Sequence, residues 1–144
     1  MNTDLIDIKI RAVEGGVTAA AGFKAAGIHA GFRKNPERLD YALVVPDKPC
    51  PGAGVFTTNR FCAAPVQVSR VNLGGADKGY GIIAGVSINS GNANAATGET
   101  GLACARETCN IASQVIGCEP QQILVASTGV IGQILPIDTF EAAV

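Results

Sequence analysis

The stretch GLACARETCNIASQVIG, residues 101–117, carries the strongest secondary-structure signal in the chain. Its apolar residues recur at helical spacing and fall on one face, namely Leu102, Ala105, Cys109, Ala112 and Ile116. Gly117 stands where a C-terminal cap belongs, because glycine readily adopts the left-handed conformation that ends many helices. The pattern therefore predicts an amphipathic helix from about Gly101 to Ile116.

Apolar runs on both sides of this helix predict strands. Gly81–Asn89 is apolar enough to be buried on both faces of a sheet, and Ile123–Ala126 reads as another strand. Val66–Val71 alternates its residues as a half-exposed strand does. Tyr41–Val45 and Val55–Thr58 flank a turn-forming segment rich in proline, so we expect these two runs to form paired strands.

The two ends of the chain have their own patterns. Gly15–Ile28 is so rich in glycine and alanine that we expect extended structure with breaks. Asp138, with Glu141 three residues later, resembles a capping box and predicts the start of a helix. Strands and helices together place the chain in the α/β class, as a single domain over residues 1–144 with no linker.

Composition limits the classes of partner. The chain has 144 residues, 47% of them hydrophobic and 16% charged, which predicts that part of its surface meets other protein. The net charge is −1 and the Lys and Arg residues are scattered, so no nucleic acid and no anionic membrane is expected as a partner. The longest apolar runs are far shorter than the ~20 residues that span a bilayer.

Localisation is expected to be cytoplasmic. Met1–Arg11 contains four charged residues and does not resemble a secretory signal. The five cysteines are odd in number and irregularly spaced, at Cys50, Cys62, Cys104, Cys109 and Cys118. This arrangement does not resemble a disulfide framework, and a reducing compartment suits it best.

Two glycine-containing segments each follow a predicted strand and precede a predicted helix. They are NSGNANAATG, residues 89–98, and STGVIG, residues 127–132. Strand-to-helix turns leave backbone N–H groups unpaired, and these groups can receive a negatively charged oxygen. Neither segment matches the phosphate-binding loop or the dinucleotide-binding fingerprint, so an anion other than a nucleotide phosphate is favoured.

Ser127-Thr128-Gly129 has the residue types that acyl transfer needs. A tetrahedral intermediate carries one oxyanion, which a small set of neutral donors stabilises. Thr128 offers a hydroxyl, and Gly129 offers a backbone N–H with no side chain to obstruct it. The alternative is that these three residues only form a turn at the strand exit.

The asparagine-rich segment also has two interpretations. Asn89, Asn92 and Asn94 can hydrogen-bond backbone groups and tolerate left-handed conformations, so the segment can serve only to hold its own shape. Alternatively, one of these side chains lies close to a substrate.

Cysteine and histidine chemistry is not favoured. Cys104 and Cys109 are five residues apart, about 140° around a helix, so they do not converge on a metal ion and no metal site is expected. His29 is the only histidine and has no carboxylate nearby in the sequence. A catalytic pair of His29 with a nucleophile is therefore not expected.

An ordered set of short segments resembles the amino-terminal region of the ornithine acetyltransferase family, the glutamate N-acetyltransferases, from about Gly15 onward. The segments are GGVTA (15–19), AAGI (25–28), GVFTTN (54–59), APV (64–66), NSGNANA (89–95), TG (97–98), STGVIG (127–132) and LPID (135–138). Each segment alone is a weak signal, whereas the ordered set is specific.

The resemblance implies a fold and an activity. The fold is the layered αββα-type sandwich of a self-processing family, incomplete in this chain. The activity is transfer of an acetyl group from N-acetylornithine to glutamate in arginine biosynthesis. No cofactor is implied, although some members accept acetyl-CoA as a donor. The precursor cleaves itself before an internal threonine, which becomes the nucleophile of the β chain and can use its own α-amine as the base.

The resemblance also assigns the site and the partners. The α chain supplies the oxyanion hole, and the corresponding positions here are Thr128 and Gly129. The expected partner is the β chain of the same precursor, in an α2β2 heterotetramer. The helical pattern that begins at Asp138 has no stop signal before Val144, and no nucleophile in its cleavage context is present. We therefore expect a fragment or truncated α chain that is inactive alone; the alternative is a non-catalytic α/β anion-binding or assembly domain.

Overall fold

The computed structural model describes residues 11–75 and 77–144. Residues 1–10, on which most of the expectation about a secretory signal rests, lie outside the described residues. The elements in chain order are η1 (Gly16–Ala19), β1 (Phe23–Ile28), β2 (Tyr41–Pro46), β3 (Cys50–Ala53), α1 (Ala64–Asn72), β4 (Tyr80–Ile83), β5 (Gly85–Asn92), α2 (Gly98–Ile116), η2 (Pro120–Gln122), β6 (Ile123–Val130) and α3 (Ile137–Ala143). The α/β class is confirmed.

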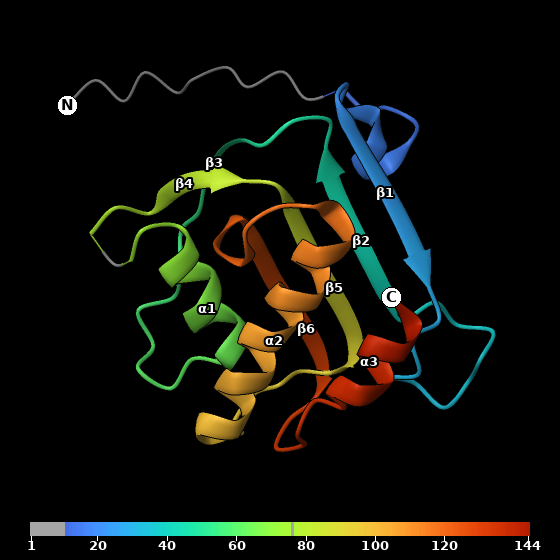
Figure 1. The fold of residues 1–144 in the computed structure, drawn as a ribbon, viewed down its shortest axis with the longest axis vertical. Coiled ribbons are helices and arrows are strands. Elements are labelled where there is room, and N and C mark those ends of the chain that lie inside the picture. The colour runs from blue at the N-terminus through green and yellow to red at the C-terminus, as the bar shows by residue number, and fades with distance from the viewer. Residues whose placement is uncertain (1–10, 76) are drawn as a thin grey trace.

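A four-stranded sheet in the order β1-β2-β5-β6 is the centre of the fold. The pairs β1–β2 and β2–β5 are antiparallel, whereas β5 and β6 are parallel and keep one register from Gly85↔Ile123 to Asn92↔Val130. Figure 1 shows α2 and α3 in front of this sheet, with α1 beside α2 at the β6 edge. One sheet with helices in front of it is half of the expected sandwich.

Helix α2 connects the two parallel strands and forms the larger core. It starts at Gly98, three residues before the predicted start, and ends at Ile116 as predicted. Gly117 adopts the left-handed conformation at φ 78°, and its N–H donates to the Ser113 carbonyl oxygen at 2.8 Å. The buried face of the helix packs on Val125 and Ile123 of β6. The helix and its glycine cap are confirmed.

A second core lies under α3. Phe140 is fully buried and contacts Tyr41 of β2, with ring centroids 4.7 Å apart in an edge-on arrangement. Ile111 of α2 and Ala30 complete this cluster. The predicted helix start near Asp138 is confirmed, because α3 begins at Ile137.

The strand predicted at Val66–Val71 is wrong, because this segment lies in helix α1. Its buried residues are Ala64, Pro65, Val68 and Ser69, which are spaced by four as on a helix face. Pro65 lies in the first turn, where its fixed φ suits a helix and its missing N–H costs nothing. The short alternation of apolar and polar residues fits both the two-residue period of a strand and the 3.6-residue period of a helix.

The pairing predicted between Tyr41–Val45 and Val55–Thr58 is also wrong. Strand β2 pairs instead with β1 and β5, while residues 55–58 form no strand and the side chain of Val55 is fully exposed. The strand that follows β2 is β3, inside the segment taken as a turn, and it pairs with β4. Gly52 permits this close pairing, because an added Cβ would lie 2.7 Å from Cγ1 of Ile83.

The run predicted as one strand at Gly81–Asn89 contains two strands. β4 ends at Ile83 and belongs to the small sheet with β3, whereas β5 begins at Gly85 and is central in the main sheet. The change of sheet occurs at Ala84, whose N–H donates to the Gln122 carbonyl oxygen at 2.8 Å. Continuous hydrophobicity predicted the burial of β5 but not this break.

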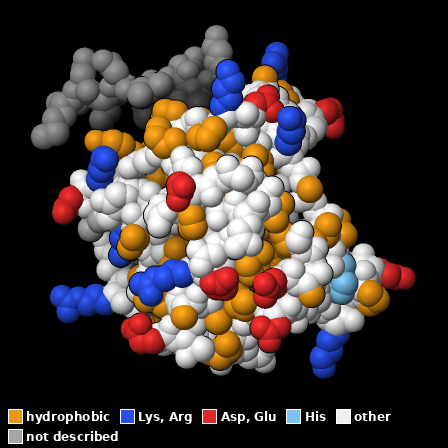
Figure 2. Space-filling view, viewed as in Figure 1, with side chains coloured by type: hydrophobic (Ala, Val, Ile, Leu, Met, Phe, Trp, Pro, Cys, Tyr) orange, Lys and Arg blue, Asp and Glu red, His pale blue; other side chains and the backbone are white. Residues whose placement is uncertain are grey.

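The described surface mixes charges and apolar groups. Figure 2 shows Lys, Arg, Asp and Glu side chains interspersed over the face that carries the helices. Among the described helices, none has both the length and the hydropathy of a membrane span.

Candidate active site at the end of β5 and β6

Ser127-Thr128-Gly129 lies inside β6, which continues to Val130. The prediction that the strand ends at Ala126 and turns at these residues is therefore wrong. The first part of Asn89–Gly98 likewise belongs to β5, and the two segments pair side by side, Ser90 with Thr128 and Gly91 with Gly129. Residues 89–92 and 127–130, which were predicted to lie in loops, are therefore paired strands of the main sheet.

Two side chains of α1 occupy the free edge of β6 along its first half. The Ser69 hydroxyl donates to the Val125 carbonyl oxygen at 2.8 Å and accepts the Val125 N–H at 2.9 Å. The Asn72 side-chain amide donates to the Ile123 carbonyl oxygen at 2.7 Å. The main-chain groups of Ile123 and Val125 therefore point away from β5 and towards α1.

Strand geometry extends this direction to Gly129. Successive residues of a strand direct their N–H and C=O groups to opposite sides. The Ala93 N–H donates to the Val130 carbonyl oxygen at 3.0 Å, so the alternate residues face β5. Because the register with β5 holds through Val130, the N–H of Gly129 lies on the same outer edge as that of Val125. Gly129 is exposed at this edge.

Only glycine fits at position 129. Its φ is +139°, a conformation that side chains rarely adopt. A Cβ at this position would overlap the backbone of Gly91 on the neighbouring strand. Thr128, one residue earlier, is exposed and pairs with Ser90, so both side chains lie on the same face of the sheet. The Thr128 hydroxyl and the outward N–H of Gly129 thus lie on adjacent residues at the sheet edge.

The segment after β6 is held by the asparagine-rich segment. The Asn92 side-chain amide donates to the carbonyl oxygens of Gln133 and Ile134, at 3.2 and 3.1 Å. The Gly132 N–H donates to the Ala95 carbonyl oxygen at 2.8 Å. These contacts keep the end of β6 next to the start of α2.

All three asparagines of this segment are buried and hydrogen-bonded internally. The Asn89 side chain donates to the Asn92 carbonyl oxygen at 2.8 Å. The Asn94 side chain donates to the Gly101 carbonyl oxygen, also at 2.8 Å. The Thr97 hydroxyl donates to the side-chain oxygen of Asn94 at 2.8 Å. These bonds favour the interpretation in which the segment holds its own shape.

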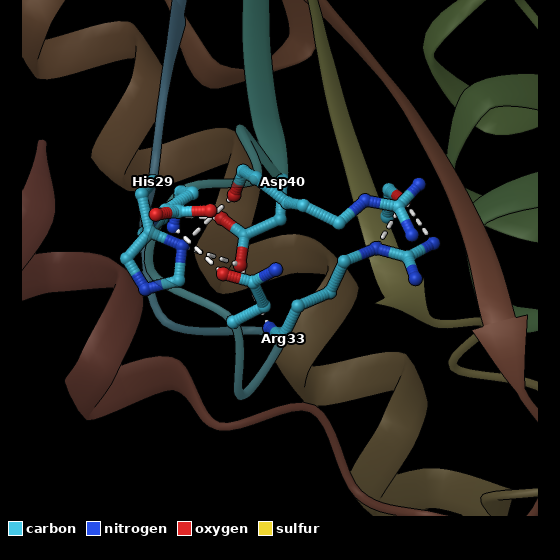
Figure 3. A network of polar contacts seen from close by, with 8 residues as sticks. His29, Arg33 and Asp40 are labelled. Atoms are coloured by element: carbon cyan, nitrogen blue, oxygen red, sulfur yellow. Dashed lines mark hydrogen bonds and ion pairs between the residues drawn. The ribbon is translucent and has the colours of Figure 1, made fainter.

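A polar network at the same end of the sheet was missed by the sequence reasoning. Asp40 is only 2% exposed and accepts the N–H groups of Ala30 at 2.6 Å and Arg33 at 2.7 Å. Nδ1 of His29 lies 3.3 Å from the Asp40 carboxylate (Figure 3). His29 therefore has a carboxylate neighbour through the fold, although none lies near it in the sequence. The available signal was a carboxylate placed directly before the apolar run that starts at Tyr41.

Cys109 is buried in the larger core. Burial raises the pKa of the Cys109 thiol from 9.0 to about 11, although a hydrogen bond from Asn72 acts in the other direction. Within residues 11–75 and 77–144, no group of His, Cys, Asp and Glu side chains could hold a metal ion. A groove of about 380 Å³ between α1 and α2 includes Cys109 and Arg106 but no residue of the candidate site.

Comparison with known proteins gives a consistent result. Residues 24–144 match the ArgJ family. The arginine biosynthesis bifunctional protein ArgJ of Dehalococcoides mccartyi is 46% identical over 126 residues, which cover 87% of this chain and 30% of that protein. The ArgJ protein of Bifidobacterium longum is 50% identical over 123 residues, covering 85% of this chain and 30% of the relative. The chain thus spans about 30% of the length of these relatives.

Two solved structures share the fold. The ArgJ protein of Bacillus halodurans matches with a TM-score of 0.79 and 35% identity, covering 89% of this chain and 64% of that one. An ornithine acetyltransferase of Mycobacterium tuberculosis, complexed with ornithine, matches with a TM-score of 0.77 and 40% identity over 88% of this chain and 66% of that one.

Proposed function

This chain belongs to the ArgJ family, and we propose that within a complete protein it supplies the oxyanion hole of a glutamate N-acetyltransferase. The reaction moves an acetyl group from N-acetylornithine to glutamate, and acetyl-CoA is a possible second donor. The observation that carries the proposal is the exposed pair formed by the Thr128 hydroxyl and the outward N–H of Gly129.

The chemistry requires these donors each time a tetrahedral intermediate forms. A threonine hydroxyl attacks the acetyl carbonyl carbon of N-acetylornithine, and its proton passes to the α-amine of the same threonine. The carbonyl oxygen becomes an oxyanion that accepts hydrogen bonds from Thr128 and Gly129. Collapse of this intermediate breaks the amide bond, the nitrogen of ornithine takes up a proton, and an acetyl ester remains on the threonine.

The second half of the reaction uses the same groups. The amine of glutamate attacks the ester carbonyl, and the new oxyanion again lies between Thr128 and Gly129. The threonine oxygen then leaves with a proton, and N-acetylglutamate is released. No histidine is needed, since the α-amine acts as the base.

The nucleophile belongs to a different part of the complete protein in this proposal. The precursor cleaves itself before a threonine, this chain contributes to the α chain, and the β chain carries the nucleophile in a cytoplasmic α2β2 assembly. The exposed apolar residues beside the open edge support such an association, since Val130 is 52% and Ile131 is 67% exposed. Residues 1–144 alone are then expected to be inactive.

The test is the substitution Thr128→Ala in the complete protein. Loss of one oxyanion donor lowers kcat by about 10²–10³, with cleavage and folding retained. Thr100→Ala, at an exposed position on α2, is the matched control and keeps the wild-type kcat. Steady-state kinetics with N-acetylornithine and glutamate measure both variants. An undiminished kcat in Thr128→Ala would remove the assignment and favour a non-catalytic assembly domain.

The intact mass of the expressed complete protein tests the processing step. Two chains that separate before a threonine are expected. A single uncut chain with full transfer activity would contradict the proposed nucleophile.

A further inference from the structure

The guanidinium of Arg33 has an unusual partner. Its Nε and Nη2 both donate to the Ser90 hydroxyl, at 2.9 and 2.6 Å. Within residues 11–75 and 77–144, the ion pairs are Lys24–Asp47 and the contact of His29 with Asp40, so Arg33 has no carboxylate partner there. Asp40 accepts the main-chain N–H of Arg33 instead, and Figure 3 shows the Arg33 side chain extending away from this carboxylate.

The position of this guanidinium is set by close backbone packing. A Cβ added to Gly91 would lie 2.8 Å from the Phe32 carbonyl oxygen and 3.0 Å from Cγ of Arg33. Gly91 in turn pairs with Gly129, so the segment containing Arg33 packs on β5 where β5 meets the candidate site. Such contacts hold the start of the Arg33 side chain in place.

Arg33 is therefore a near neighbour of Thr128. Ser90, which holds the guanidinium, pairs directly with Thr128 on the adjacent strand and shares its face. Adjacent strands are about 4.8 Å apart. The serine that holds the guanidinium thus lies roughly one strand spacing from the proposed oxyanion donor, with the positive charge one hydrogen bond further on.

In the part of the chain that the structure describes, no carboxylate balances the charge on Arg33. The residue is only half exposed, and a serine hydroxyl accepts hydrogen bonds but carries no negative charge. A guanidinium has five N–H donors in a fixed fork, and the fork matches the two oxygens of a carboxylate. Two of these donors are used on Ser90, which leaves others for a ligand.

We propose that Arg33 binds the α-carboxylate of the amino-acid substrate and so orients it beside Thr128 and Gly129. This inference rests on the proposed function. N-acetylornithine and glutamate both carry a carboxylate on the same carbon as the nitrogen that loses or gains the acetyl group. One cation next to the oxyanion donors therefore serves both halves of the reaction.

The experiment measures KM and kcat of the complete protein carrying Arg33→Gln. Loss of a contact made equally in the ground state and the transition state raises KM and leaves kcat unchanged. We expect KM for N-acetylornithine to rise by about 30-fold or more, with kcat within about threefold of the wild type. Arg38→Gln removes the same charge from an exposed position nearby and is the matched control, with both constants unchanged.

A second substrate separates binding from a structural role. N-acetylputrescine is N-acetylornithine without its carboxylate, so Arg33→Gln should change its kcat/KM by less than about threefold while lowering that of N-acetylornithine by about 30-fold. Equal losses on both substrates, or a loss of kcat with an unchanged KM, would overturn the inference. Absence of transfer by the wild-type protein would instead defeat the proposed function, so the two failures are distinguishable.

Discussion

The two halves of β6 differ in what lies along their outer edge. In the first half, Ile123 and Val125 are buried, and Ser69 and Asn72 of α1 hydrogen-bond their outward main-chain groups. In the second half, Thr128 to Val130 are exposed beyond these α1 contacts. The outer edge of β6 is therefore covered along Ile123–Val125, which we call the closed half, and uncovered along Thr128–Val130, which we call the open half.

This difference separates stability from function within one element. An open strand edge is a liability, because its unpaired groups can recruit other chains. Helix α1 closes the edge where the strand contributes to the core. The edge opens where the outward N–H of Gly129 binds an oxyanion in the proposed reaction. At the same position, glycine permits a close contact with the backbone of Gly91 that a side chain would block.

The largest effect is expected in the open half, from Gly129→Ala in the complete protein. The new Cβ would overlap the backbone of Gly91, so the N–H of residue 129 must move and kcat should fall by about 10³ or more. Steady-state kinetics measure this loss.

Gly132→Ala is the control for Gly129→Ala. Gly132 also has a positive φ, of +79°, but a Cβ there would meet no atom within 4 Å. Urea unfolding should show a cost of about 1 kcal/mol for Gly132→Ala and a larger one for Gly129→Ala. Equal costs would mean that the contact with Gly91 does not distinguish the open half.

An intermediate effect is expected on the alkylation rate of Cys109. This residue lies beneath the closed half, with its sulfur 3.7 Å from the Ile123 carbonyl oxygen. Its pKa of about 11, against 9.0 for an ordinary thiol, means that the reactive thiolate is about 100-fold scarcer at pH 8 in the folded protein than in the unfolded chain. Alkylation, followed by mass spectrometry, should be slower by that factor or more and should accelerate about tenfold per pH unit towards pH 11.

The half-exposed Cys50 is the internal control for Cys109, and we expect it to be alkylated much faster in the folded protein. Similar rates at the two cysteines would show that the closed half opens readily to solvent.

The smallest effect is expected from Ser69→Ala, which removes the side chain that closes the edge. Both main-chain groups of the buried Val125 then lose their partner, which costs about 2 kcal/mol of unfolding free energy. The kcat of the folded protein should not change, because Ser69 does not touch the candidate site. Urea unfolding measures the cost.

Ser113→Ala is the matched control for Ser69→Ala. The Ser113 hydroxyl donates to the Asn110 carbonyl oxygen within α2, so its loss should cost less than about 1 kcal/mol. If the two substitutions proved equally costly, closure of the β6 edge would not be the role of Ser69.

Elements with a long and unambiguous period could be predicted from the sequence. Helix α2 has four turns of consistent apolar spacing and a glycine stop, so its type and its end at Ile116 were correct. Helix α1 could not be recognised, because residues 66–71 are too few to distinguish a period of two from one of 3.6. The ordered segments that resemble a family identified the residues of the candidate site. They did not predict that these residues lie in a strand rather than in a turn.

The sequence by itself determined the α/β class, the central helix and the family, because local periodicity and an ordered set of short segments depend only on neighbours along the chain. The tertiary structure decided that Ser127-Thr128-Gly129 lies in a strand, that α1 closes half of its edge, and that Arg33 reaches Ser90 beside Thr128. These features depend on pairings between residues far apart in the chain. Local propensity cannot encode them, since each requires the two partners to be brought together by the sheet.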